Sequence, residues 1–105
     1  MSEHAFGLDP LIHAPVRLRI LTILADAADA DFVHLRDEIG TTDGNLSRHL
    51  AKLEEAGYVR VKKGYAGKRP RTTCSLTKKG RRAFLAYLEQ LAGIVEAARA
   101  AGMEG

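Results

Sequence analysis

The stretch from Thr42 to Val61 constrains the fold more than any other part of this chain, because it encodes a helix with both ends marked. Its apolar residues recur four and three positions apart and therefore share one helix face: Leu46, Leu50 and Leu53. Thr42 is a good N-cap residue, and Gly57 suits the left-handed position that ends a helix. The sequence predicts a helix over residues 43–56 with one buried face and one polar face.

A shorter helix is expected directly before it, over residues 34–39. Gly40 ends this segment, and only Thr41 and Thr42 then separate the two helices. Two helices joined by a three-residue turn that contains glycine are typical of a helix-turn-helix, whose second helix lies in the major groove of DNA.

The segment before these helices adds a third helix. Three features are expected there: a short turn of helix over 10–13, a helix over about 15–28, and a polar loop over 26–31. Phe32-Val33 either forms a short strand or caps the core. Arg17 and Arg19 are expected to point outward from the helix.

A hairpin and a long final helix are expected after the central helix. A strand over 58–63 alternates apolar and basic residues, and a return strand covers about 71–76, with Gly64 and Gly67 on either side of the tip. Cys74 falls on the inward face of the return strand and is expected in the core. Thr77 caps the last helix, over 78–100, whose apolar stripe is longer than one small core can cover.

Charge is divided unequally along the chain. Residues 42–82 hold twelve Lys or Arg against three acidic residues, a net charge of +9, whereas the rest holds four against ten, a net charge of −6. A basic run is often only a solvated face. Here it covers a helix–hairpin–helix pattern, which favours a polyanionic partner.

Other classes of protein are disfavoured. No apolar run approaches the roughly 20 residues of a membrane-spanning helix, the N-terminus does not resemble a signal peptide, and a single cysteine excludes an internal disulfide, so a cytoplasmic protein without a membrane partner is expected. The four histidines are scattered: His4, His13, His34 and His49. With no Cys pair, no nucleophile–base–acid set and no phosphate-binding glycine loop, no metal, no cofactor and no enzyme activity are expected.

The order helix, helix, turn, helix, hairpin, helix is that of a winged helix-turn-helix, a mainly α fold with a small β-hairpin wing. Four segments carry a resemblance to MarR/ArsR-type bacterial and archaeal transcriptional regulators: the first core helix at 15–24, the recognition helix at 45–59, the wing at 68–72 and the start of the closing helix at 76–81. The similarity covers about residues 8–92 and is nearest to small, stand-alone regulators without an effector domain. The metal-sensing cysteines found in many ArsR-type proteins have no counterpart here.

The resemblance implies a DNA-reading surface on the second helix of the motif. Its candidate residues are Thr42, Asp43, Gly44, Asn45, Ser47, Arg48, His49 and Lys52. Arginine can pair with guanine and asparagine with adenine in the major groove, while free N–H groups at the helix start can bind phosphate. Asp43 is favoured as a cap residue over a base contact. His49 is equally consistent with a DNA contact and with partial burial against the hairpin.

The hairpin is expected to bind DNA as the wing, with an arginine in the minor groove and lysines on phosphate. Its candidate residues are Lys62, Lys63, Lys68, Arg69 and Arg71. The alternative is that these charges only protect a sheet edge. Phosphate contact by Lys78 and Lys79, and the role of Tyr65, stay open.

A two-fold dimer is expected through the terminal segments. The predicted interface residues are Leu8, Leu11, Ile12, Leu88, Leu91, Ile94 and Val95. A dimer would hold two recognition helices about one DNA turn apart, roughly 34 Å, on a near-palindromic operator.

The function predicted is therefore a sequence-specific, double-stranded-DNA-binding transcriptional regulator. The alternative is a winged-helix protein-interaction module whose basic face meets an acidic partner. The expected domains are an N-terminal arm and short helix (1–14), a DNA-binding domain (15–82), and a dimerisation helix with a frayed end (83–105). A small-molecule effector stays open, although no convergent polar groups indicate one.

Overall fold

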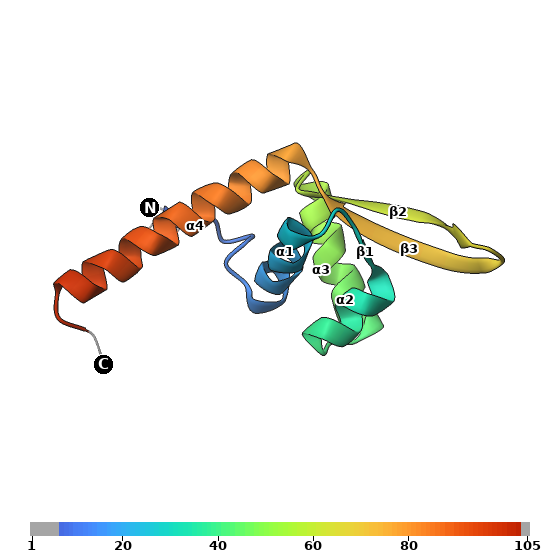
Figure 1. The fold of residues 1–105 in the computed structure, drawn as a ribbon, viewed down its shortest axis with the longest axis horizontal. Coiled ribbons are helices and arrows are strands. Elements are labelled where there is room, and N and C mark those ends of the chain that lie inside the picture. Colours follow the sequence, from blue (N-terminus) through green and yellow to red (C-terminus); the bar gives the residue numbers. More distant parts are fainter. Residues whose placement is uncertain (1–6, 104–105) are drawn as a thin grey trace.

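Seven elements follow one another in the computed structural model, which describes residues 7–103 of the chain. They are α1 (Pro15–Asp26), β1 (Ala30–Asp31), α2 (Phe32–Ile39), α3 (Asp43–Glu55), β2 (Val59–Ala66), β3 (Arg69–Leu76) and α4 (Lys78–Ala100). Figure 1 shows α1, α2 and α3 packed together, with the β2–β3 hairpin leaving the cluster on one side and α4 on the other. The first six residues of the predicted arm, His4 among them, and the last two of the predicted frayed end lie outside the described range.

The helix-turn-helix forms as the sequence predicts. α2 ends at Gly40, whose φ of 78° is the left-handed conformation that glycine adopts without strain. Thr42 caps α3, since its Oγ1 accepts a 3.1 Å hydrogen bond from the backbone N–H of Asn45. The apolar stripe of α3 is fully buried in the core: Leu46, Leu50 and Leu53.

The segment before α2 differs from its prediction. Residues 26–31 are not all loop, because Ala30 and Asp31 form β1 and pair with Cys74 and Thr73 of β3. Phe32 begins α2 and packs against the core, while Val33 is exposed. A two-residue strand carries too little periodicity to be found in the sequence, and only its partner strand identifies it.

The sheet is antiparallel, with strand order β1-β3-β2. Both long strands extend further than predicted, and Ala66 pairs with Arg69 at the tip. The turn therefore contains only Gly67 and Lys68, with Gly67 at a φ of 66°. Gly64 lies within β2 opposite Arg71, so the prediction that it borders the tip is wrong. Cys74 is buried as predicted, and burial raises the pKa of its thiol to about 11.

A tight corner joins the hairpin to α4. Thr77 Oγ1 accepts the N–H of Gly80 at 2.9 Å and donates to the carbonyl of Gly57 at 2.6 Å. A Cβ on Gly80 would lie 2.0 Å from the carbonyl oxygen of Tyr58. Only glycine allows the first turn of α4 to approach the start of β2 this closely.

The N-terminal turn packs into the core of its own chain. Leu8 and Ile12 are buried, and Leu11 is half-buried against the same core. The prediction that Leu8 and Ile12 belong to a dimer interface is corrected, because their side chains are already covered within the protomer. A polar side chain of the N-terminal turn also has a partner in α4, since His13 Nδ1 and the Tyr87 hydroxyl are 2.8 Å apart.

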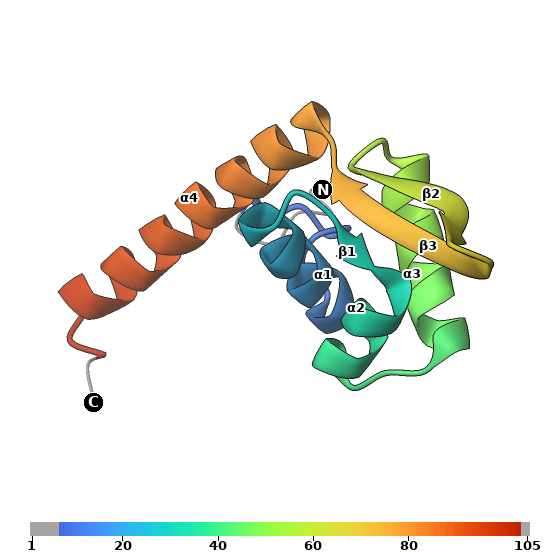
Figure 2. The same cartoon turned by 45° about the vertical axis from the view of Figure 1, so that its right-hand side comes forward.

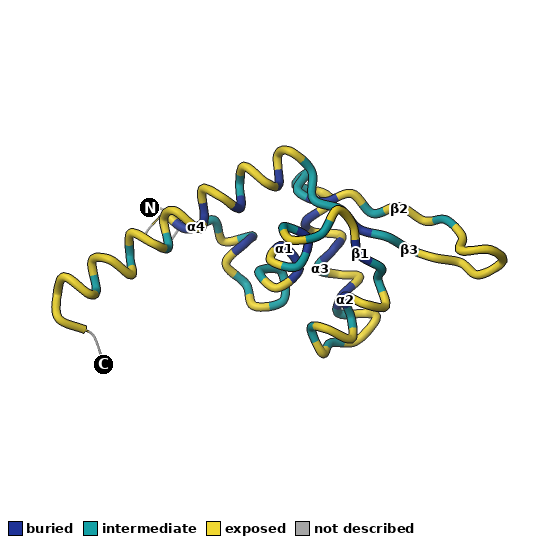
Figure 3. Tube along the Cα trace, in the orientation of Figure 1, coloured by how far each residue is buried: buried dark blue, intermediate teal, exposed yellow. Residues whose placement is uncertain are grey.

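α4 contributes to the core along its first half and, through Leu91 and Ile94, into the start of its second half. Phe84 and Tyr87 are buried, and Leu91 and Ile94 are half-buried. Figure 3 shows the remainder of the helix largely exposed, and Figure 2 shows it extending away from the three-helix cluster. Among the described residues, no helix combines the length and the apolar character needed to cross a membrane.

Candidate nucleic-acid interface

The solvent face of α3 forms the first part of the candidate interface. Most of its predicted residues are exposed: Thr42, Asp43, Gly44, Ser47, Arg48 and Lys52. Asn45 and His49 are half-buried, because each has a partner in a neighbouring segment. Since the leucine stripe fixes the opposite face in the core, these residues point to solvent together.

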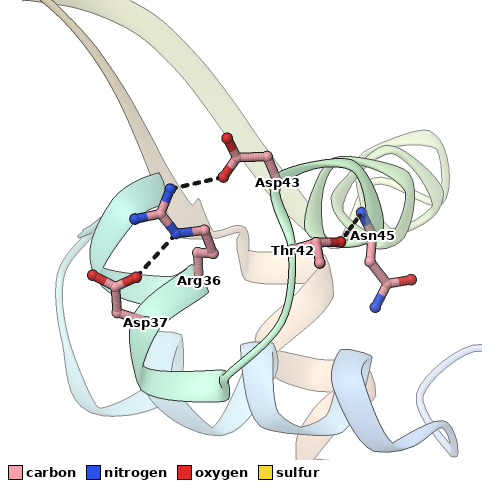
Figure 4. A network of polar contacts seen from close by, with 5 residues as sticks. All are labelled: Arg36, Asp37, Thr42, Asp43 and Asn45. Carbon is pink, nitrogen blue, oxygen red and sulfur yellow. Dashed lines mark hydrogen bonds and ion pairs between the residues drawn. The ribbon is translucent and has the colours of Figure 1, made fainter.

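The acid at the start of α3 is neutralised by α2. Arg36 Nη1 lies 2.9 Å from Asp43 Oδ1, and its Nε lies 2.9 Å from Asp37 (Figure 4). The hydrogen bond to Asp43, then that to Asp37, raises the pKa of Arg36, so the guanidinium stays charged. Asp43 is thus an ion-pair partner, while the cap is Thr42. Arg36 also joins the two helices of the motif and was not among the predicted site residues.

Three side chains form a chain of hydrogen bonds across the turn and the first two turns of α3. Asn45 Nδ2 donates to Thr41 Oγ1 at 2.7 Å, and Arg48 Nη2 donates to Asn45 Oδ1 at 2.5 Å. Asn45 and Arg48 are three residues apart, which places them on one helix face. Arg48 therefore has a fixed partner within the protein while its other donors remain exposed.

His49 contacts Arg17 of α1. Arg17 Nη1 lies 3.0 Å from His49 Nδ1, while Arg17 Nε donates to the carbonyl of Leu11 at 2.5 Å. Because an arginine can only donate, Nδ1 must accept, and the imidazole is neutral in this contact. Burial, followed by the charges of Arg17, Arg48 and Lys52, lowers the pKa of His49. The prediction that Arg17 points outward is wrong, because its long side chain folds back over the N-terminal turn.

The predicted wing residues are divided between two faces of the hairpin. Residues opposite one another in an antiparallel pair share a face. Lys63 pairs with Thr72 and lies on the side of α3, whereas Lys62, Arg69 and Arg71 lie on the other side and Lys68 lies in the turn. Arg71 Nε is 2.6 Å from Asp31 Oδ1, which joins the hairpin to β1.

An open groove of about 330 Å³ separates α3 from the hairpin. Its lining residues are Phe32, Ser47, Leu50, Ala51, Glu54, Val61, Lys63 and Thr72. Glu54 Oε2 accepts the N–H of Val61 at 3.4 Å, which ties the end of α3 to β2. Lys63 places a positive charge in the groove beside the exposed face of α3.

The base of the hairpin is fixed by a tyrosine that was not among the predicted site residues. The Tyr58 hydroxyl donates to Asp9 Oδ2 at 2.8 Å, and Lys79 Nζ lies 5.9 Å from the centre of the Tyr58 ring. Burial and Asp9 raise the pKa of Tyr58 to about 12. This cation–π contact gives Lys79 a partner within the protein at the start of α4, where a cation is otherwise disfavoured. No cluster of three candidate metal ligands occurs within residues 7–103.

Comparison with known proteins relates this geometry to a family. A family model described as a winged helix DNA-binding domain matches residues 16–95. The uncharacterised protein MJ0432 from Methanocaldococcus jannaschii is 38% identical over 81 residues, which is 77% of this chain and 88% of that protein.

Solved structures give the same architecture. A transcriptional regulator homologue from Pyrococcus horikoshii OT3 superposes with a TM-score of 0.82 at 29% identity, over 88% of this chain and 91% of that one. The regulator MosR of M. tuberculosis, solved in complex with DNA, superposes with a TM-score of 0.68 at 23% identity, over 91% and 67% of the two chains. MarR-family and ArsR-family regulators are also among the similar structures.

Proposed function

Because the chain belongs to the family of winged helix DNA-binding domains, we propose that it is a sequence-specific regulator that reads a DNA duplex with α3. DNA binding and transcription regulation follow from the family and from similar structures of the MarR and ArsR types. Sequence specificity, a near-palindromic operator, a homodimer, the absence of catalysis and a cytoplasmic location are the further parts of the proposal.

One observation carries the proposal of sequence-specific binding. The leucine stripe fixes α3 in the core, while Ser47, Arg48 and Lys52 stay exposed on its outer face. The outward side chains are of the types that contact bases and phosphates. Ser47 and Arg48 lie in the N-terminal half of the helix, the part that reaches base edges in helix-turn-helix proteins, whereas Lys52 lies in its last turn.

The basic hairpin supports non-specific attraction to the same duplex. Lys68 and Arg69 are exposed at its tip, beyond the reach of β1. We propose that they contact phosphate or the minor groove. We also propose that Lys62 and Lys63, which lie on opposite faces of the hairpin, contact the DNA phosphate backbone. Arg71 contributes less, because Asp31 already neutralises it.

The proposed dimer uses the exposed side of α4 from Leu88 onward. Leu88 is 39% exposed and Val95 is 44% exposed, on a helix that extends beyond the core (Figure 3). Leu91 and Ile94, which are half-buried, border the same surface. With Leu8 and Ile12 assigned to the core, the interface proposed here is confined to α4 and the edge of Leu11.

Fluorescence anisotropy on labelled duplexes tests the proposal, with a selected site compared against a scrambled one over a range of salt. The Lys68→Ala variant should weaken binding to both duplexes and reduce the salt slope by about one unit. The Arg48→Ala variant should lose about 1–3 kcal/mol of preference for the selected site. Arg99→Ala, which removes a charge from the far end of α4, is the matched control. Binding that is absent, or that does not depend on salt, would refute the proposal.

A further inference from the structure

The hydrogen-bond chain Thr41–Asn45–Arg48 raises the question of which side chain reads the bases. The amide orientation of Asn45 follows from its partners. Arg48 can only donate, so it must face the amide oxygen, which leaves the amide nitrogen for Thr41 Oγ1. Each end of the Asn45 amide therefore has one partner within the protein, and together the two partners fix the orientation of the amide.

Direct recognition of adenine by Asn45 needs the amide to offer its nitrogen and its oxygen together to the base edge. The contacts with Thr41 and Arg48 leave one N–H and one oxygen lone pair of the amide, and they fix the direction in which these groups point. Here the Nδ2 to Thr41 distance is 2.7 Å, at the short end of the usual hydrogen-bond range, and the Oδ1 to Arg48 distance of 2.5 Å is shorter still. Asn45 is also half-buried, whereas Arg48 is exposed.

Arg48, by contrast, keeps donors for a ligand. A guanidinium has five N–H groups, and the contact with Asn45 uses one of them. Side chains on a helix lean toward its N-terminus, which is the end of a recognition helix that reaches base edges. The remaining donors of Arg48 are thus available for the two acceptors of a guanine.

The backbone fixes the other end of the chain. The carbonyl of Arg36 accepts N–H groups from both Gly40 and Thr41, at 2.9 and 3.1 Å. Thr42 Oγ1 holds the backbone N–H of Asn45. The turn of the motif therefore sets the position of the Thr41 hydroxyl relative to α3.

We propose that Thr41 is a specificity-determining residue that touches no base, and that it acts by holding Asn45 as a buttress for Arg48. Arg48 is the guanine reader, Asn45 limits its freedom, and Thr41 fixes Asn45. This inference rests on the proposed function, since it requires a preferred DNA site. From its residue type, Asn45 is expected to pair with an adenine of its own. In this inference it contacts no base and instead affects recognition of the base pair that Arg48 contacts.

The test begins with selection of sites from a duplex library with a randomised centre, using the full chain. Wild type should select a site with a guanine whose replacement by adenine weakens binding roughly 5- to 150-fold, the range of one bidentate contact. The Thr41→Val variant keeps the shape of the side chain but cannot accept the hydrogen bond. It should lose most of that discrimination, while its affinity for a scrambled duplex and its salt slope stay unchanged.

Two further variants separate orientation from folding. Thr41→Ser restores the hydroxyl and should restore discrimination at the guanine. Thr22→Val, which removes a hydroxyl bonded to the Leu18 carbonyl on α1, is the matched control and should discriminate like wild type. Thermal unfolding of all variants checks that each one folds.

A separate comparison identifies the role of Asn45. Asn45→Ala and Arg48→Ala should reduce discrimination at the same base pair. The double variant should lose no more discrimination than Arg48→Ala alone. The inference is overturned if Asn45→Ala relaxes a different, adenine-containing base pair, or if Thr41→Val discriminates like wild type. If wild type itself selects no site, both the inference and sequence-specific binding are overturned. If wild type selects a site and Thr41→Val discriminates at the guanine as well as wild type does, only the inference is rejected.

Discussion

The Tyr58 hydroxyl donates a 2.8 Å hydrogen bond to the Asp9 carboxylate across 49 residues of chain. Tyr58 stands between α3 and β2, and Asp9 stands in the turn before α1. The contact therefore links the base of the hairpin to the N-terminal turn, which in turn packs against α1 and α4.

Replacing Tyr58 with Phe removes this hydrogen bond but keeps the ring under Lys79. We expect the free energy of unfolding to fall by about 1–2 kcal/mol, because the lost bond is half-buried and has a charged acceptor. Tyr65→Phe is the matched control, since Tyr65 is 75% exposed on the hairpin. Urea unfolding measures both. In a tyrosinate titration, Tyr58→Phe should also remove the group that titrates near pH 12, and an unchanged titration would contradict the role given to Asp9.

Gly80 and Gly93 form a matched pair on α4. Gly80→Ala would place a Cβ against the carbonyl of Tyr58, so the corner between β2 and α4 must open. We expect a loss of about 3 kcal/mol or more. At Gly93 no atom lies within 4 Å of an added Cβ, and alanine should stabilise the helix by up to about 1 kcal/mol. Thermal unfolding distinguishes the two. Equal effects would show that helix propensity, and not the close approach, controls this corner.

His49 is expected to make the free energy of unfolding decrease as the solution becomes acidic. Its pKa is lower in the fold than its ordinary value of 6.5, so the unfolded chain binds the proton more readily. The contribution of His49 is complete above about pH 6.5 and is lost as the pH falls below it. His49→Gln, which still offers an oxygen to Arg17, should flatten the stability profile between about pH 5 and 7. His34→Gln, which replaces a histidine on the exposed face of α2, is the matched control.

Leu88→Glu and Val95→Glu test the proposed dimer. Both side chains are more than a third exposed within the protomer, so the fold should tolerate the change while a shared apolar surface should not. Sedimentation velocity should show a shift from dimer to monomer, with little change in the unfolding of the monomer. Glu89→Ala, on the same part of α4, is the control. A wild-type chain that sediments as a monomer at every concentration would reject the dimer.

The elements of the fold could be predicted because their signals are local. The stripe Leu46, Leu50 and Leu53 and the caps Thr42 and Thr77 depend on residues a few positions apart, and each was found where the sequence placed it. The two-residue strand β1 has no such signal, because its existence depends on a partner more than forty residues away.

The partners of the site residues could not be predicted in the same way. Arg17 looked like an exposed helix residue, but its flexible side chain reaches Leu11 and His49. Leu8 and Ile12 are apolar, and their composition alone does not say whether a core or a second protomer covers them. Which face each hairpin lysine occupies required the strand register.

The close approach of Gly80 to Tyr58 has a mechanical consequence. β2 and α4 diverge from this corner in both ribbon views (Figures 1 and 2), and the first turn of α4 lies directly against the backbone of Tyr58 there. α4, at 23 residues, is about 34 Å long. In the proposed dimer each α4 acts as a rigid rod. A tilt of about 10° at the point where the two α4 helices cross would displace the hairpin and α3 at the other end of each rod by roughly 6 Å. A shift of that size is a sixth of a DNA turn. The packing of the distal ends of α4, which lie far from the duplex, would therefore determine whether both recognition helices fit their half-sites.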